Sequence, residues 1–232
     1  MKISNPFRDL SRLELFLWLF SVISISVSFL AAFALSSECD VLTLIASLIG
    51  VTALIFLAKG YVLGQLLTIV FAVFYGIISY YFRYYGEMIT YLGMTAPSAA
   101  AAAIAWLRHP YQGTKEVAVH RLSPRQWLIV SSLCILTTIL FYPILGYFGN
   151  ANLRLSTLSI TTSFLASALT FYRSPYYALA YAANDVILIG LWVLASMEKL
   201  SSLPMVICFF MFLINDLYGY ISWQRMKKRQ TA

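Results

Sequence analysis

The stretch YYALAYAANDVILIGLW, residues 176–192, places an Asn-Asp pair at positions 184–185 inside an apolar run. The same pair returns at positions 215–216 within FFMFLINDLYGYISW, residues 209–223. An acid or amide that faces hydrocarbon costs several kcal/mol unless it has a partner. Two such pairs in long apolar runs therefore predict membrane helices that share a polar interior.

The composition of the whole chain predicts an integral membrane protein. Hydrophobic residues make up 61% of the 232 residues and charged residues only 11%, whereas about a quarter of a soluble domain is charged. Runs of roughly 20 apolar residues, the length that crosses a bilayer, recur along the chain and predict an all-α protein with about eight transmembrane helices. The predicted helices are 14–35, 41–58, 61–82, 88–107, 127–148, 155–172, 176–196 and 202–223.

Basic residues divide unevenly between the two sides of this eight-helix arrangement. Thirteen of the sixteen Lys and Arg residues fall on one side, and only Arg83, Arg154 and Lys199 fall on the other. Positive charge gathers on the cytoplasmic side of membrane proteins. We therefore expect a multi-pass protein of the plasma (inner) membrane with both termini cytoplasmic. The net charge of +7 then reflects topology and attraction to membrane lipid, and we expect no nucleic-acid partner.

The same arrangement divides the chain into two membrane halves. A shift of 114 residues superimposes Lys59 on Arg173 and Gly76 on Gly190, with the helices of both halves in register. Because equivalent positions are four helices apart, the halves enter the membrane in the same direction and leave a cleft near mid-membrane for a small polar solute. The predicted parts are a cytoplasmic N-terminus (1–13), a first membrane half (14–107), a cytoplasmic linker (108–126), a linking helix with the second membrane half (127–223) and a basic cytoplasmic tail (224–232).

Helical spacing indicates which polar and aromatic side chains face this cleft. An amide supplies donors and an acceptor, and a carboxylate supplies acceptors, which suits ribose hydroxyls or an amide-bearing ring. Tyr and Trp rings suit stacking on a flat or cationic heterocycle. The candidate substrate-binding residues are Gln65, Thr68, Tyr75, Tyr91, Thr95, Tyr181, Asn184, Asp185, Trp192 and Asn215.

Each of these side chains also has a purely structural alternative. Ser, Thr and Asn in membrane helices often bond only to a neighbouring helix, and Trp192 suits an anchor at the membrane interface equally well. An acid within a membrane helix is a functional candidate by default. Asp216, near the end of its helix, nevertheless also suits a structural pair with Lys59 or Arg173.

The order of elements resembles the PnuC-type vitamin transporters over essentially the whole chain. The resemblance rests on the two Asn-Asp stretches and on AKG at 58–60, GQLLTIVFAVFYG at 64–76 and YYFRYYGEMITYLG at 80–93. It implies a SWEET-like fold, with two parallel three-helix bundles joined by a linking helix, and one extra N-terminal helix. It also implies uptake of nicotinamide riboside, an NAD precursor, by facilitated diffusion with alternating access. Trapping by a cytoplasmic kinase and self-association as a homo-oligomer are implied as well.

One part of this resemblance bears on the substrate. Asp185 matches the family's Asp of the seventh helix, but the nicotinamide riboside branch typically carries Trp-x-x-Trp before it. The corresponding positions here are Ala178 and Tyr181. Related branches carry thiamine, riboflavin or deoxynucleosides, so another ring-bearing solute of this kind is the alternative substrate.

Two other classes of function are alternatives to transport. The chain has nine acidic residues, no HExxH-like spacing and three cysteines without disulfide or zinc spacing. We therefore expect neither an enzyme nor a bound cofactor. The alternative of a different class is a substrate-binding membrane subunit that needs an energising partner, for which the linker 108–126 offers a dock. Transport by the chain alone in liposomes separates that alternative from a self-sufficient transporter.

Overall fold

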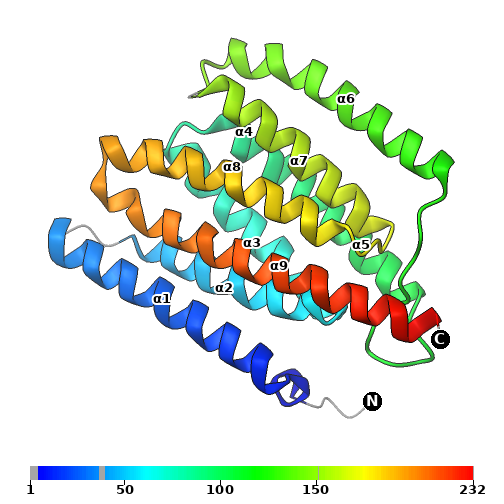
Figure 1. The fold of residues 1–232 in the computed structure, drawn as a ribbon. Helices are drawn as coiled ribbons and strands as arrows, with labels where there is room; N and C mark the ends of the chain where they lie inside the picture. Colours follow the sequence, from blue (N-terminus) through cyan, green and yellow to red (C-terminus); the bar gives the residue numbers. More distant parts are fainter. Residues whose placement is uncertain (1–4, 37–39, 151, 232) are drawn as a thin grey trace.

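The fold is all-α over the residues that the structure describes. The computed structural model describes residues 5–36, 40–150 and 152–231, and within them the only β-structure is two isolated bridges. Figure 1 shows the helices packed side by side as a bundle. The helices are η1 (Pro6–Asp9), α1 (Arg12–Ser36), α2 (Val41–Ala58), α3 (Val62–Tyr81), α4 (Tyr85–Ile89), the π-helical segment η2 (Thr90–Thr95), α5 (Ala96–Arg108), α6 (Pro124–Tyr147), α7 (Leu153–Phe171), α8 (Tyr177–Glu198), η3 (Leu200–Ser202) and α9 (Leu203–Thr231).

Seven of the described helical stretches are long and apolar enough to cross a membrane. They include α1, α2, α3, the continuous stretch Tyr85–Arg108, α6, α8 and α9. The predicted all-α multi-pass membrane protein is thus confirmed. The long helix α7 coincides with the predicted segment 155–172 but is less apolar, because eight of its nineteen residues are Ser or Thr. That α7 is an eighth span stays a prediction.

The last helix is longer than the sequence pattern indicates. The predicted helix ends at 223, yet α9 continues through the basic tail to Thr231. The Gln230 side chain accepts a hydrogen bond from Val119 N (2.7 Å) and donates one to Val117 O (3.1 Å). Arg229 forms an ion pair with Glu116. These contacts with the linker hold the tail in place, and the helix continues there as a result.

Six helices form a closed ring, and two more lie outside it. Around the ring, within the described residues, α2 packs on α3, α3 on α5, α5 on α7, α7 on α8, α8 on α9, and α9 back on α2. Outside it, α1 packs against α2 and α9, and α6 packs against α7. In Figure 1, α2 and α7 run in the same direction, as do α3 and α8. The ring therefore consists of a first set (α2, α3, α4–α5) and a second set (α7, α8, α9) in parallel orientation.

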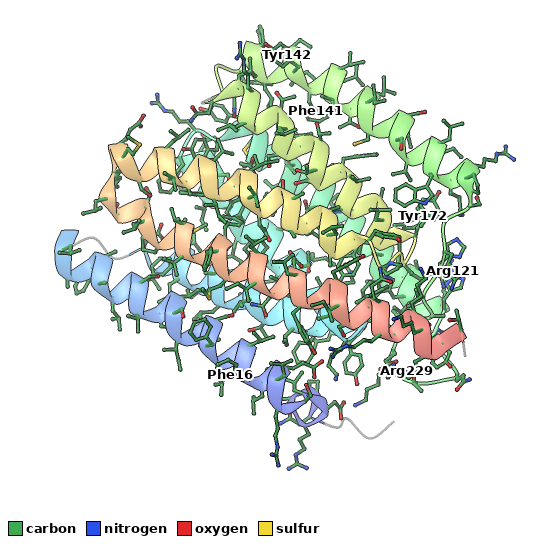
Figure 2. All side chains as sticks on the ribbon, viewed as in Figure 1. Phe16, Arg121, Phe141, Tyr142, Tyr172 and Arg229 are labelled. Atoms are coloured by element: carbon green, nitrogen blue, oxygen red, sulfur yellow. The ribbon has the colours of Figure 1, made fainter. Side chains whose placement is uncertain are left out.

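Helix η1, the last turns of α9 and the linker between α5 and α6 lie at one end of the ring, which we call the terminal end (Figure 1). Val117 N donates to Gly60 O (3.0 Å) on the α2–α3 turn, and His120 N donates to Arg173 O (3.1 Å) on the α7–α8 turn. Arg121 and Arg229 are labelled at this end in Figure 2. The linker therefore connects equivalent turns of the two sets.

The outward faces of the bundle are apolar, as a lipid-facing surface requires. Figure 2 labels Phe16 on α1 and Tyr142 on α6, and these side chains are 62% and 50% exposed. The buried core lies inside the ring, with Trp106, Trp192 and Trp223 among its largest fully enclosed side chains. In the absence of water, exposed aliphatic and aromatic side chains on outer helices carry no hydrophobic penalty.

Glu14 fastens the outer helix α1 to the ring. Its carboxylate accepts hydrogen bonds from Lys59 Nζ (3.1 Å) at the end of α2 and from Tyr218 OH (3.1 Å) on α9. Removing one partner of a buried ion pair leaves the other charge uncompensated. We expect Glu14→Ala to lower the free energy of unfolding by about 3 kcal/mol, measured by thermal unfolding in detergent.

The exposed pair of Lys115 and Asp9 is the matched control. Its N–O distance is 2.7 Å, and the Lys115 hydrogen bond lowers the pKa of Asp9, yet the two side chains are 51% and 33% exposed. Exposed pairs contribute little, so Asp9→Ala should leave the unfolding temperature nearly unchanged. Equal losses in the two variants would show that burial of Glu14 is not what fastens α1.

Candidate functional site

A small cavity lies between the two sets of helices. Its volume is about 50 Å³, which accommodates a few water molecules and is well below the roughly 300 Å³ at which ligand pockets begin. Side chains from α2, α3, η2, α8 and α9 contribute to its wall. The lining residues are Gly50, Ala53, Leu54, Leu57, Thr68, Phe71, Tyr91, Thr95, Tyr181, Asn184, Asp185, Phe212 and Asp216.

Two carboxyl groups meet on one wall of this cavity. Asp185 on α8 and Asp216 on α9 are each 4% exposed, and their side chains lie within hydrogen-bonding reach of each other. No described N–H or O–H group donates to Asp185 Oδ2. Neither cation considered as a structural partner of Asp216 pairs with it among the described residues, since Lys59 pairs with Glu14 and no described ion pair joins Asp216 to Arg173. The pair is thus a concentrated acceptor site.

Asn184 extends the polar wall toward α7. Its Oδ1 accepts hydrogen bonds from Ser159 Oγ (3.1 Å) and Thr162 Oγ1 (2.9 Å), both on α7. These two bonds fix the amide orientation and occupy its acceptor. The Nδ2 donors take no part in them, so Asn184 has hydrogen-bond donors to offer next to a carboxyl pair that only accepts.

Aromatic rings from α3, η2 and α9 form a second part of the cavity lining, which we call the aromatic wall. Phe71 packs edge-on against Tyr91 (centroids 5.7 Å apart) and against Phe212 (5.4 Å), so it joins the rings of η2 and α9. Behind them, Trp192 Nε1 donates to Tyr75 OH (2.8 Å), and the Tyr75 ring lies 4.3 Å from that of Tyr91. A cavity that combines an aromatic wall with a carboxyl pair suits a flat ring, and a cationic ring most of all.

The structure brings six of the ten sequence-predicted residues to this cavity. Thr68, Tyr91, Thr95, Tyr181, Asn184 and Asp185 line it. The other four do not belong to its lining. Tyr75 and Trp192 are buried behind it and support Tyr91, Gln65 is buried one helical turn from Thr68, and Asn215 donates to Ser21 Oγ (2.9 Å) on α1.

Of the second Asn-Asp pair, Asp216 rather than Asn215 contributes to the cavity. Adjacent helical residues point about 100° apart, and α9 has α1 on its outer side, where Asn215 finds its partner. Phe71 and Phe212 were also missed by the sequence reasoning. The repeated Asn-Asp pair was the signal for Asp216, whereas ordinary apolar phenylalanines in membrane helices give no signal.

The segment that supplies Tyr91 and Thr95 is not the plain α-helix that the sequence predicts over 88–107. Thr90–Thr95 forms a π-helical turn, η2, directly before α5, which has Pro97 in its first turn. Proline lacks the N–H that would continue an α-helical ladder, and a π turn accommodates the break by one wider loop of backbone. Such turns occur frequently at functional sites.

Two larger hollows, of about 440 and 280 Å³, open at the ends of α3 and α8 away from the terminal end. Tyr81, Phe82 and Lys199 contribute to both. Neither hollow contains a converging set of buried acids among the described residues. The central cavity is the candidate binding site because buried acids, an amide and aromatic rings converge on it.

A cavity with buried polar groups between two parallel sets of membrane helices is the architecture of a solute transporter. The chain belongs to the nicotinamide mononucleotide transporter family, whose model matches residues 40–225. It is 28% identical over 193 residues to a nicotinamide riboside transporter PnuC of Neisseria mucosa, with 81% of this chain and 73% of that protein covered. A PnuC of Haemophilus influenzae with the same description is 23% identical over 190 residues, covering 81% of each.

The fold likewise resembles a solved structure. A crystal structure of the vitamin B3 transporter PnuC superimposes with a TM-score of 0.80 at 25% sequence identity, and the match covers 95% of this chain and 94% of that one. The resemblance to the PnuC-type family that the sequence motifs indicated is thereby confirmed.

Gly50 offers a test of the cavity that leaves its polar groups untouched. A Cβ at this position on α2 would overlap the Phe212 ring and lie 3.0 Å from Phe71. Both rings belong to the aromatic wall, and overpacking costs about 1–3 kcal/mol. We expect Gly50→Ala to weaken ligand binding roughly tenfold. Gly93→Ala on η2 is the control, because a Cβ there would meet nothing closer than 3.9 Å. This variant should bind the ligand as the parent does. Equal affinity in the two variants would argue against this cavity as the binding site.

Proposed function

We propose that this protein transports nicotinamide riboside across the plasma membrane and that the ligand binds in the cavity between the two sets of helices. The observation that supports the proposal is that the Asp185–Asp216 pair and the aromatic wall line the same cavity. Nicotinamide riboside joins a cationic pyridinium ring to a ribose and a carboxamide. The carboxyls complement the positive ring, the aromatic wall stacks on it, and Asn184, Thr68 and Thr95 supply hydrogen-bonding groups for hydroxyls and amide.

The small size of the cavity supports transport by alternating access. At about 50 Å³ the closed site is smaller than a nucleoside, so the two sets of helices have to separate for the ligand to reach it. Rocking of one set against the other around a central site opens each side in turn. At the terminal end, the linker connects the α2–α3 turn to the α7–α8 turn. We assign this end to the cytoplasm and propose that it forms one of the two gates.

We further propose facilitated diffusion followed by trapping inside the cell. The sequence contains no Gly-Lys-Ser/Thr phosphate-binding loop, and direct ATP drive is therefore not part of the mechanism. A cytoplasmic kinase that phosphorylates the riboside adds negative charge, and the product then no longer suits a cavity lined by two acids. We also propose that the protein self-associates as a homo-oligomer, which the family resemblance supports.

Thiamine is the second candidate substrate. It too carries a permanently cationic heterocycle, which the carboxyl pair favours over the uncharged deoxynucleosides and riboflavin. The residues at the Trp-x-x-Trp positions support thiamine as a candidate. Tyr181 lines the cavity, whereas Ala178 is fully buried and does not belong to the lining. The stacking platform therefore differs from that of the nicotinamide riboside branch.

Binding and transport by the purified chain test the proposal. Five compounds are titrated into the purified protein by calorimetry: nicotinamide riboside, nicotinamide mononucleotide, thiamine, riboflavin and a deoxynucleoside. We expect the protein to bind nicotinamide riboside and not to bind the mononucleotide. Liposomes that contain only this protein should likewise take up nicotinamide riboside and not the mononucleotide. Preference for a neutral ring compound would contradict the proposal, and binding without uptake would favour the substrate-binding subunit that needs an energising partner.

A further inference from the structure

Among the described residues that line the cavity, no Lys or Arg balances the charge of the Asp185–Asp216 pair. The two carboxyls lie within hydrogen-bonding reach of each other, and the residues lining the cavity include neither Lys nor Arg. Asp185 Oδ2 is buried and receives no hydrogen bond from any described donor. Two carboxylates in contact repel strongly in a low-dielectric site, unless a proton or another cation lies between them.

The described groups around the pair offer no positive charge that could compensate the two carboxylates. Those that interact electrostatically with Asp185 or Asp216 are Tyr91 from η2, Tyr177 and Tyr181 from α8, and Cys208 from α9. Phenols and thiols are uncharged near neutral pH. The cavity side chains of α2 and α3 are apolar apart from Thr68. The described residues around the pair thus supply no positive charge, and a proton or another cation is needed to neutralise it.

We propose that the Asp185–Asp216 pair holds one proton between its carboxyls when the cavity is empty, and that a cationic ring displaces this proton to water when it binds. The inference rests on the proposed function. One O–H bond breaks, the proton leaves to solvent, and the positive ring takes its place beside two carboxylates. Because proton and ligand carry the same charge, the cavity has the same net charge before and after binding.

This exchange makes the affinity for a cation depend on pH in a defined way. A ligand that releases one proton binds up to tenfold more tightly for each unit by which the pH rises, over the range in which the empty pair holds its proton. A neutral ligand of the same shape gains nothing from the same change. The dihydropyridine form of nicotinamide riboside is such a ligand, since it keeps the ribose and carboxamide and lacks the ring charge.

Calorimetry in two buffers of different ionisation enthalpy, at one pH, measures the proton directly. With the unmodified full chain and nicotinamide riboside, we expect release of about one proton per ligand bound. Asp216→Asn should abolish the release while the cation still binds to Asp185. Glu87→Gln, which alters a buried acid outside the cavity lining, should retain it. The neutral dihydro compound should release none with the unmodified chain, which makes the test independent of any variant.

The outcomes separate the inference from the function on which it rests. Binding of nicotinamide riboside with no proton release, or with the same release in Asp216→Asn, overturns the inference and leaves transport of the riboside standing. Absence of binding by either cationic ring compound, nicotinamide riboside or thiamine, overturns the proposed function and the inference together. Release of one proton with thiamine instead would support the inference and transfer it to the second candidate substrate.

Discussion

Replacement of Asp185 by asparagine is expected to weaken the binding of nicotinamide riboside about a hundredfold or more. Asparagine keeps the size of the side chain and removes its negative charge from a buried site. Truncating one partner of a buried charge pair costs roughly 2–5 kcal/mol, and each 1.4 kcal/mol is about tenfold in affinity. Calorimetric titration of the purified variant measures the loss, and thermal unfolding verifies that the variant is folded.

Asn215→Ala is the matched control for that experiment. Asn215 is as deeply buried as Asp185 and belongs to the other Asn-Asp pair, but its amide donates to Ser21 and to the Met211 carbonyl. Its loss should reduce stability through the contact between α9 and α1 and leave affinity unchanged. An affinity loss in Asn215→Ala as large as that in Asp185→Asn would mean that the effect is one of folding and not of ligand recognition.

Gly64→Ala should cause a large loss of stability. Gly64 lies in the first turn of α3, where an added Cβ would come within 2.6 Å of the Leu57 backbone nitrogen and 2.8 Å of its Cγ. A backbone atom cannot rotate away as a side chain can, so α2 and α3 would have to separate. Overpacking of this kind lowers the free energy of unfolding by about 2–3 kcal/mol, which thermal unfolding in detergent detects as a lower transition temperature.

The control for this prediction is Gly190→Ala on α8. No heavy atom lies within 4 Å of the position that a Cβ would take there. Because alanine favours helix over glycine by about 1 kcal/mol, this variant should be as stable as the parent or slightly more so. If Gly64→Ala and Gly190→Ala unfold at the same temperature, close approach of α3 to α2 is not what Gly64 provides.

The membrane class and most helix positions could be predicted because they depend on local properties. A bilayer requires about 20 apolar residues per span, and this requirement is visible in any window of the sequence. The errors arose where contacts distant in sequence decide. Helix α9 extends to Thr231 because Gln230 and Arg229 bind the linker, and the π turn at Thr90–Thr95 is a backbone detail for which Pro97 was the only local sign.

The candidate site shows the same division. The sequence alone determined that polar side chains at Thr68, Tyr91, Asn184 and Asp185 needed partners in an apolar chain, because an unpartnered polar group in hydrocarbon is costly. Only the tertiary structure decided which partner each one has. Asn215 turns to α1, whereas its neighbour Asp216 meets Asp185 in the cavity. Helical periodicity defines a face, but the face becomes a site only when the ring closes and brings α8, α9 and η2 around the same cavity.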